Sequence, residues 1–126
     1  MIEVKELTKY YGEHLAVDHL TFSVKEGEVL GFLGPNGAGK STTMNMLTGY
    51  LSASSGQIRI NGVDLSENPL EAKRNIGYLP ELPPLYMDMT VQEYLKFMYR
   101  LKKVHGKEKR EEHIAKICEQ VKLTDV

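Results

Sequence analysis

Residues 34–41 read Gly34-Pro35-Asn36-Gly37-Ala38-Gly39-Lys40-Ser41, a complete G-x-x-x-x-G-K-S pattern. Small residues at this spacing let successive backbone N–H groups converge on a β-phosphate, while the lysine ammonium reaches the β and γ oxygens and the serine hydroxyl ligates Mg²⁺. The alternative is a chance match in a glycine-rich turn, which arises in roughly one chain of this length in a few hundred. The pattern therefore predicts a phosphate loop that binds a nucleoside triphosphate.

The segments on either side of the phosphate loop predict a strand before it and a helix after it. Val29 to Leu33 is a short apolar run of the kind that forms a parallel strand buried on both faces. Thr42 to Leu47 is expected to continue a helix that closes at Gly49. The N-terminus of this helix would add unpaired N–H groups and the positive end of its dipole to an anion site.

The 126-residue chain has the composition of a soluble globular protein of one domain, with 41% hydrophobic residues, 26% charged residues and a net charge of -1. Since there is no excess of basic residues, we expect no nucleic-acid partner. No apolar run approaches the ~20 residues of a membrane span, and the first residues do not resemble a signal peptide, so we expect a cytosolic protein. The single cysteine, Cys118, excludes an internal disulfide and a cysteine zinc site and is expected to pack in the core.

Apolar and polar residues alternate in three segments as they do in half-buried antiparallel strands, namely Ile2–Val4, Leu20–Val24 and Gln57–Ile60. The last of these is followed by Asn61-Gly62, a dipeptide typical of hairpin turns. Ile76 to Leu79 is predicted to form one more strand, which Pro80 stops.

Three further helices are predicted from capping residues and apolar periodicity. A short one covers 68–74, where an asparagine N-cap is followed by a first-turn proline. Thr90 and Glu93 form a capping box at the start of the second, which Gly106 ends. The third is amphipathic and covers roughly 107–122.

Four stretches of the sequence resemble, in the same order, motifs of the ATP-binding subunit of ABC transporters. They are Leu7 to Gly12 (the A-loop), Gly34 to Thr42 (the Walker A motif), Ser55 to Ile58 with Asn61-Gly62 (the strand after the Walker A helix) and Ile76 to Glu81 (the Q-loop strand). The resemblance runs from end to end of the chain and identifies it as the N-terminal part of such a subunit.

The fold that this resemblance implies is α/β, a P-loop NTPase core with a partial parallel sheet. An antiparallel β part would occupy residues 1–28, and the core from Walker A to the Q-loop would occupy residues 29–81. The start of an α-helical subdomain would occupy residues 82–126.

The resemblance also implies an ATP site. Tyr11 would stack on the adenine, because an aromatic face suits a purine. Tyr10 is the competing candidate, and the alternative role for Tyr11 is that of a rim aromatic between two strands. The remaining contacts to the nucleotide would come from Gly34, Pro35, Asn36, Gly37, Ala38, Gly39, Lys40, Ser41 and Thr42.

Glu81 stands where most of the family has a glutamine that contacts the metal and the attacking water. The resemblance implies that Lys40 and Glu81 take part in catalysis and that Ser41 and Glu81 ligate Mg²⁺. Like the amide, the carboxylate offers an oxygen to the metal, and it adds a negative charge near the γ-phosphate. The alternative is that Glu81 is a solvated acid in a loop.

Several family motifs are missing from this sequence: a hydrophobic run ending in Asp-Glu after the phosphate loop, the LSGGQ signature, and a histidine beyond such a run. We therefore expect this chain to bind ATP without hydrolysing it. The whole subunit would be an ATPase that energises transport, with export favoured, at the cytoplasmic face of the membrane. Its partners would be a transmembrane permease subunit and a second ATP-binding subunit. Two alternatives stay open, a soluble ABC ATPase without a membrane partner and a nucleotide-binding module without turnover.

Residues 82–87, directly after Glu81, are apolar and contain two adjacent prolines. Proline stiffens the backbone and disfavours helix, so Leu85, Tyr86 and Met87 would be held in a loop that is normally polar. An exposed apolar loop predicts a partner surface, here for the membrane subunit. The alternative is that these side chains fold back beneath the helix that starts at Thr90.

Overall fold

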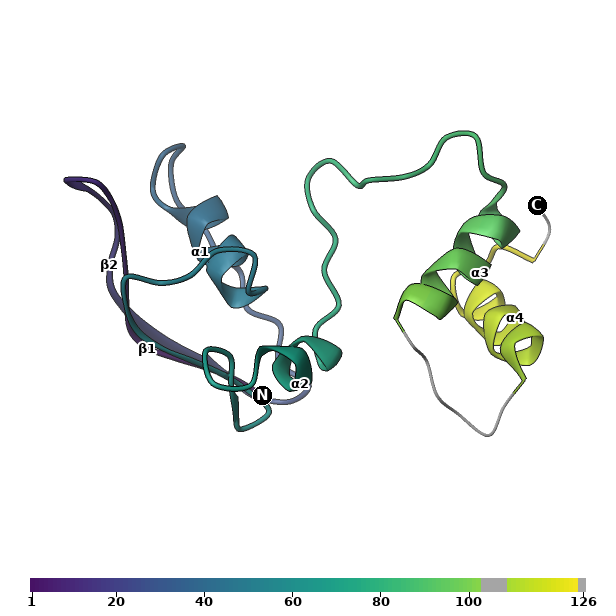
Figure 1. The fold of residues 1–126 in the computed structure, drawn as a ribbon, viewed down its shortest axis with the longest axis horizontal. Coiled ribbons are helices and arrows are strands. Elements are labelled where there is room, and N and C mark those ends of the chain that lie inside the picture. The colour runs from purple at the N-terminus through teal and green to yellow at the C-terminus, as the bar shows by residue number, and fades with distance from the viewer. Residues whose placement is uncertain (103–108, 125–126) are drawn as a thin grey trace. The chain divides into compact units, whose positions relative to one another are not determined.

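The computed structural model describes residues 1–102 and 109–124. The chain divides into two compact units, Met1–Leu79 and Pro80–Val126 (Figure 1). The first unit contains the phosphate loop, and the second contains two helices.

The first unit is built on an antiparallel sheet of four strands in the order β2-β1-β3-β4. The strands are β1 (Ile2–Tyr11), β2 (His14–Val24), β3 (Ser55–Ile60) and β4 (Val63–Asp64). They contain the three antiparallel strands predicted from alternation, and β1 and β2 extend well beyond the predicted limits. Asn61 and Gly62 link β3 to β4 with φ values of 49° and 80°, as the tight hairpin turn predicted there requires.

The pairing of β1 with β2 is interrupted by three shifts of register. Glu6 and His19 lie beside two of them and have positive φ angles of 49° and 42°. At the third, Lys9 pairs with Val17 and the next residue pairs with Leu15, so Ala16 is the extra residue on β2. Such bulges bend a strand and re-aim its groups, and this one lies where β2 meets the phosphate loop.

Helix α1 (Lys40–Leu47) packs against the sheet and supplies the centre of the core. Met46 is 1% exposed, and it clusters with buried side chains from all the longer strands: Val4, Leu7, Val17, Ile58 and Ile60. The predicted closure at Gly49 is confirmed, since this glycine has a φ of 67° and its N–H donates to the Met46 carbonyl oxygen at 3.0 Å. A short helix, α2 (Pro69–Arg74), follows β4 as predicted and buries Ala72 completely.

Two apolar runs predicted to be strands lie in the first unit, Val29–Leu33, which is expected to be parallel, and Ile76–Leu79. Both are described by the structure, and neither is a strand, so this part of the prediction is wrong. Val29 is 96% exposed and Leu33 is 94% exposed. A parallel strand needs a neighbour for its N–H and C=O groups and a covering layer on each face. Among the described residues the sheet is wholly antiparallel, and it supplies neither run with such a neighbour.

The second unit contains α3 (Val91–Leu101) and α4 (Arg110–Gln120). The capping box of Thr90 and Glu93 is confirmed, with the Glu93 carboxylate accepting from the Thr90 N–H at 2.8 Å. The rings of Tyr99 and His113 join the two helices at a centroid distance of 5.6 Å. The predicted helix end at Gly106 lies outside the described residues, as does the predicted start of the last helix at 107.

Cys118 of α4, which the sequence predicts to pack in the core, is only partly buried. The buried residue of this helix is Ile114, at 7% exposure. In the described ranges, none of the helices is both long and apolar enough to cross a membrane.

Candidate nucleotide site

The phosphate loop owes its shape to two glycines with left-handed backbones. Gly37 and Gly39 both have a φ of 83°, a conformation that other residues adopt only with strain. Between them, the Ala38 N–H donates to the Pro35 carbonyl oxygen at 3.2 Å. The loop therefore turns tightly just before the first residue of α1.

Gly39 rests directly on the bulge in β2. A β-carbon at this position would clash with the carbonyl oxygen of Ala16 and would lie 3.0 Å from Cγ2 of Val17. Only a glycine lets the loop approach the strand this closely. The antiparallel sheet thus supports the end of the phosphate loop and fixes where α1 begins.

The Lys40 side chain folds back across the loop that precedes it. Its ammonium donates to the carbonyl oxygens of Gly34 at 2.6 Å and Pro35 at 2.7 Å. A lysine ammonium has three N–H donors, so one of them is left for a further acceptor. A positive charge is therefore held among the backbone groups of the loop, where an anion with several oxygens could complete its bonding.

The start of α1 adds further donors beside this charge. The N–H groups that precede the first bond of a helix have no partner inside it, and in α1 that first bond runs from the Thr43 N–H to the Gly39 carbonyl oxygen at 2.8 Å. Among the described residues no side chain caps this end, and the first turn of α1 contains no acidic residue. The positive end of the helix dipole is thus uncompensated, and the exposed Ser41 hydroxyl lies in the same turn.

Tyr10 and Tyr11 lie at the far end of β1, 47% and 49% exposed respectively, so exposure does not separate the two candidates. The alternation of side chains along β1 distinguishes them, because side chains two residues apart share a face of a strand. Tyr11 therefore shares a face with Lys9, which pairs with Val17, and Val17 is the residue in contact with the loop at Gly39. This alternation favours Tyr11 as the aromatic on the side of the phosphate loop.

Glu81 follows the apolar run 76–79 and is exposed. It belongs to the second unit, whereas every residue of the phosphate loop belongs to the first. Within the first unit, the structure assembles the phosphate loop, α1 and the end of β1.

Sequence reasoning missed the residues that support the loop from outside. Ala16 and Val17 hold Gly39 in place, and Ser52 and Ser54 hold the end of β1. Their contacts depend on a strand bulge and on chain segments about 40 residues apart. A local indication was the presence of Ser52 and Ser54 between the helix and the next strand, because serine hydroxyls in connections often form hydrogen bonds with backbone groups.

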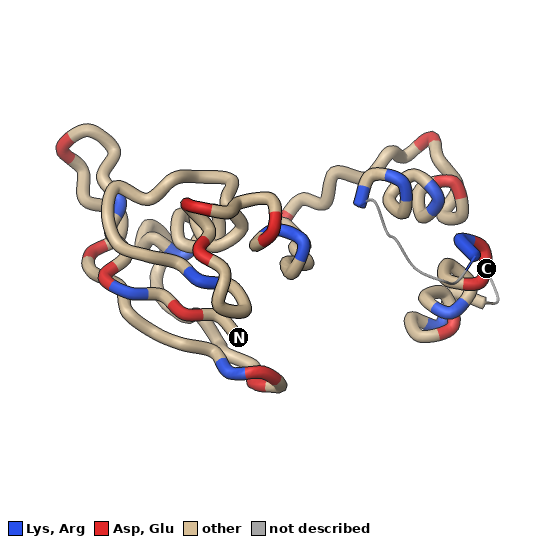
Figure 2. Tube along the Cα trace, turned by 60° about the horizontal axis from the view of Figure 1, so that its bottom comes forward, with Lys and Arg blue, Asp and Glu red and all other residues tan. Residues whose placement is uncertain are grey.

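Charges of both signs are spread over the first unit. Figure 2 shows Lys and Arg residues interspersed with Asp and Glu residues over the first unit.

Two titratable groups of the sheet have shifted pKa values. Hydrogen bonds from Ser66 and Gln57 lower the pKa of the buried Asp64 carboxyl from 3.8 to about 2. At another register shift of β2, a hydrogen bond to the Asp18 carboxylate raises the pKa of His19. Asp64 joins β4 to the start of α2, so its role is structural.

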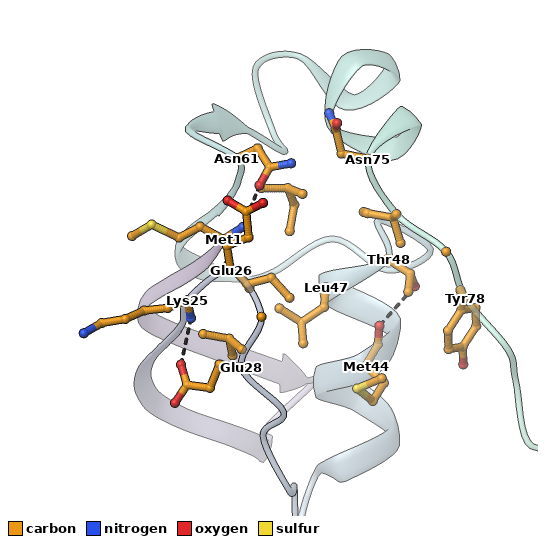
Figure 3. A pocket seen from close by; sticks show the side chains of 16 residues that line it. Met1, Lys25, Glu26, Glu28, Met44, Leu47, Thr48, Asn61, Asn75 and Tyr78 are labelled. Carbon is orange, nitrogen blue, oxygen red and sulfur yellow. Dashed lines mark hydrogen bonds between the residues drawn. The ribbon is translucent and has the colours of Figure 1, made fainter. Parts of the chain in front are cut away.

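A cavity of about 560 Å³ lies at the other end of α1, between the end of the helix (Met44, Leu47 and the C-cap residue Thr48) and the segments 25–28 and 75–78 (Figure 3). Its rim is held by the N-terminal ammonium, which donates to Asn61 Oδ1 at 2.6 Å. None of the residues of the phosphate loop lines it. We therefore place the candidate site at the loop and not in this cavity.

A family model described as "ABC transporter" matches residues 17–126, which include the phosphate loop, all of α1 and both helices of the second unit. The chain belongs to the ABC transporter family. The chain is similar to a dimeric structure of MJ0796, a bacterial ABC transporter cassette, with a TM-score of 0.79 and 26% sequence identity. The alignment covers 100% of this chain and 58% of that one. The fold is thus that of an ABC cassette, whose N-terminal antiparallel β part corresponds to the sheet described above.

Two curated relatives agree with this assignment. The chain is 41% identical over 126 residues to the probable multidrug ABC transporter ATP-binding protein YbhF of Escherichia coli (strain K12), which covers 100% of this chain and 22% of that protein. It is 43% identical over 107 residues to the bacitracin transport ATP-binding protein BcrA of Bacillus licheniformis, covering 85% of this chain and 35% of that protein. The chain therefore spans between about a fifth and about a third of these two relatives.

Proposed function

We propose that this ABC transporter chain binds MgATP at its phosphate loop. The proposal rests on the position of the Lys40 ammonium, which donates to the carbonyl oxygens of Gly34 and Pro35 and keeps one N–H for a further acceptor. This ammonium lies beside the N-terminus of α1, which none of the described side chains caps. The β- and γ-phosphates would lie on the loop N–H groups and on Lys40. Tyr11 would stack on the adenine.

Mg²⁺ fits one donor beside this loop, the Ser41 hydroxyl. The Ser41 hydroxyl is exposed at the start of α1, and hydroxyl and carboxylate oxygens are ligands that this ion accepts. We propose Ser41 as one ligand and Glu81 as a second, with Lys40 and Glu81 taking part in hydrolysis. Bound Mg²⁺ neutralises charge that develops on the phosphates during phosphoryl transfer.

In the whole protein, we propose that this chain is part of an ATP-binding subunit that energises transport, with export favoured. The relatives named for multidrug and bacitracin transport support this proposal. In the proposed division of the chain, residues 1–28 begin the antiparallel part, to which β3 and β4 of the core segment 29–81 also belong, and residues 82–126 form the helical part. Such a subunit would work on the cytoplasmic face of a membrane.

Two partners complete this proposal. One is a second ATP-binding subunit, supported by the dimeric state of the similar cassette MJ0796. The other is a transmembrane permease subunit, which would meet residues 82–87. In that segment Leu82 is 87% exposed and Met87 is 90% exposed, whereas the Tyr86 ring packs edge-on against Phe97 of α3 at 5.6 Å. Tyr86 thus partly follows the alternative that the loop folds back onto the helix, and Leu82 and Met87 carry the proposed surface.

The test is a titration of the chain with a fluorescent ATP analogue in the presence of Mg²⁺. Lys40→Ala should weaken binding by about tenfold or more, because a hydrogen bond to a charged phosphate is lost together with the charge. Lys25→Ala is the matched control, since Lys25 lies in an exposed turn and its side chain is not part of the loop. Equal affinity for the wild type and the Lys40 variant would contradict the proposal.

A further inference from the structure

Lys9 lies two residues before Tyr11 in β1, and the extra residue of the neighbouring bulge is Ala16 of β2, so the two side chains share one face of β1. The Lys9 ammonium stands 5.4 Å from the centroid of the Tyr11 ring, within the range of a cation–π contact. It also donates a hydrogen bond to the Ser52 carbonyl oxygen at 2.7 Å. The ammonium is therefore held in place by a second chain segment while it faces the ring.

The segment that holds Lys9 is itself fastened to β1 at two further points. The Ser54 N–H donates to the Thr8 carbonyl oxygen at 2.9 Å, and the Ser54 hydroxyl accepts from the Tyr10 N–H at 3.0 Å. Three hydrogen bonds thus join residues 52–54 to the end of β1. The end of the strand cannot shift along this segment without breaking them.

The same segment continues directly from α1. The N–H groups of Tyr50 and Leu51 both donate to the Asn45 carbonyl oxygen, at 2.9 Å and 3.0 Å. Since α1 starts at the phosphate loop and residues 52–54 follow its far end, one continuous piece of chain links the loop to Lys9. The aromatic ring and the phosphate loop are thereby fixed to the same helix.

We propose that Lys9 is a positioning residue for the base of the nucleotide, a role that rests on the proposed binding of ATP. Its ammonium covers one face of the Tyr11 ring and restricts the rotation of that ring, which leaves the opposite face for a purine. Restricting a side chain before binding lowers the entropy lost when the ligand arrives. Lys9 acts through Tyr11 and not through the phosphates, which are served by the loop and by Lys40.

The test compares two ligands that differ in the base. Dissociation constants are measured for MgATP and for magnesium tripolyphosphate, which has no base, with the wild type and with Lys9→Met. We expect Lys9→Met to weaken MgATP binding by about two- to fivefold, the range of an exposed cation–π contact, and to leave tripolyphosphate binding unchanged. Lys9→Arg should restore MgATP binding, and Lys5→Met on the same strand is the matched control.

A double-mutant cycle separates positioning from a general effect on the fold. In a Tyr11→Ala background, Lys9→Met should have no further effect on MgATP, because the ring through which it acts is gone. An equal loss for both ligands, a persistent loss without Tyr11, or unchanged MgATP affinity in the single variant would overturn the role of Lys9. Failure of the proposed function looks different, since the wild type would then bind neither ligand.

Discussion

Replacing Gly39 with alanine tests whether contact with β2 shapes the phosphate loop. The φ of 83° costs a non-glycine residue about 1–2 kcal/mol, and the added β-carbon would also clash with the Ala16 carbonyl oxygen. Gly37→Ala is a matched control, because Gly37 has the same φ of 83° and no described atom would lie within 4 Å of its β-carbon. The difference between the two variants therefore isolates the contact with Ala16 and Val17.

We expect Gly37→Ala to lower the free energy of unfolding of the first unit by about 1–2 kcal/mol and Gly39→Ala to lower it by a further 1 kcal/mol or so. Urea unfolding followed by tyrosine fluorescence measures both values. Gly39→Ala should also weaken MgATP binding more than Gly37→Ala does, since the start of α1 must move away from β2. Equal losses of stability in the two variants would refute the view that β2 seats the loop.

Three further predictions concern other parts of the molecule. Because the folded pKa of Asp64 is about 2 against an ordinary 3.8, its contribution to stability is present above pH 3.8 and is lost as the pH falls towards 2. Asp64→Asn should therefore lower the free energy of unfolding by about 2 kcal/mol at neutral pH and reduce the loss of stability between about pH 4 and pH 2, measured by urea unfolding at each pH. An unchanged loss of stability over this pH range would count against the prediction. The chain alone should release no phosphate from ATP, because its sequence lacks a metal-holding Asp-Glu run, and release that disappears in Lys40→Ala would prove this wrong. In the full-length subunit, replacing Leu82 and Met87 with serine should impair transport while ATP binding persists, and unchanged assembly together with unchanged transport would defeat the proposed partner surface.

Features coded by neighbouring residues could be predicted from the sequence. The G-x-x-x-x-G-K-S pattern, the Asn61-Gly62 turn and the capping box at Thr90 each depend on a few adjacent residues, so their chemistry is visible without the fold. The helix after the phosphate loop was predictable for the same reason. Its first turn begins at Lys40, two residues before the predicted run.

Features that depend on distant partners could not be predicted. Val29–Leu33 has the composition of a buried strand, but a strand exists only where a neighbour pairs with it, and the described sheet supplies none. The bulge at Ala16 and the bond from Lys9 to Ser52 join segments far apart in the sequence. Glu81 falls in a different unit from the loop, so its proposed part in the site rests on the family resemblance.

The central claim, that the phosphate loop is where MgATP binds, is tested most directly by following backbone amide resonances during a titration with MgATP. The account predicts the largest shifts at Gly37, Gly39, Lys40 and Ser41, whose N–H groups would surround the proposed phosphate position, and predicts that Lys40→Ala raises the MgATP concentration needed to produce them by about tenfold or more. Shifts centred instead on the cavity at the other end of α1, around Asn75 and the residues that follow it, would contradict the claim.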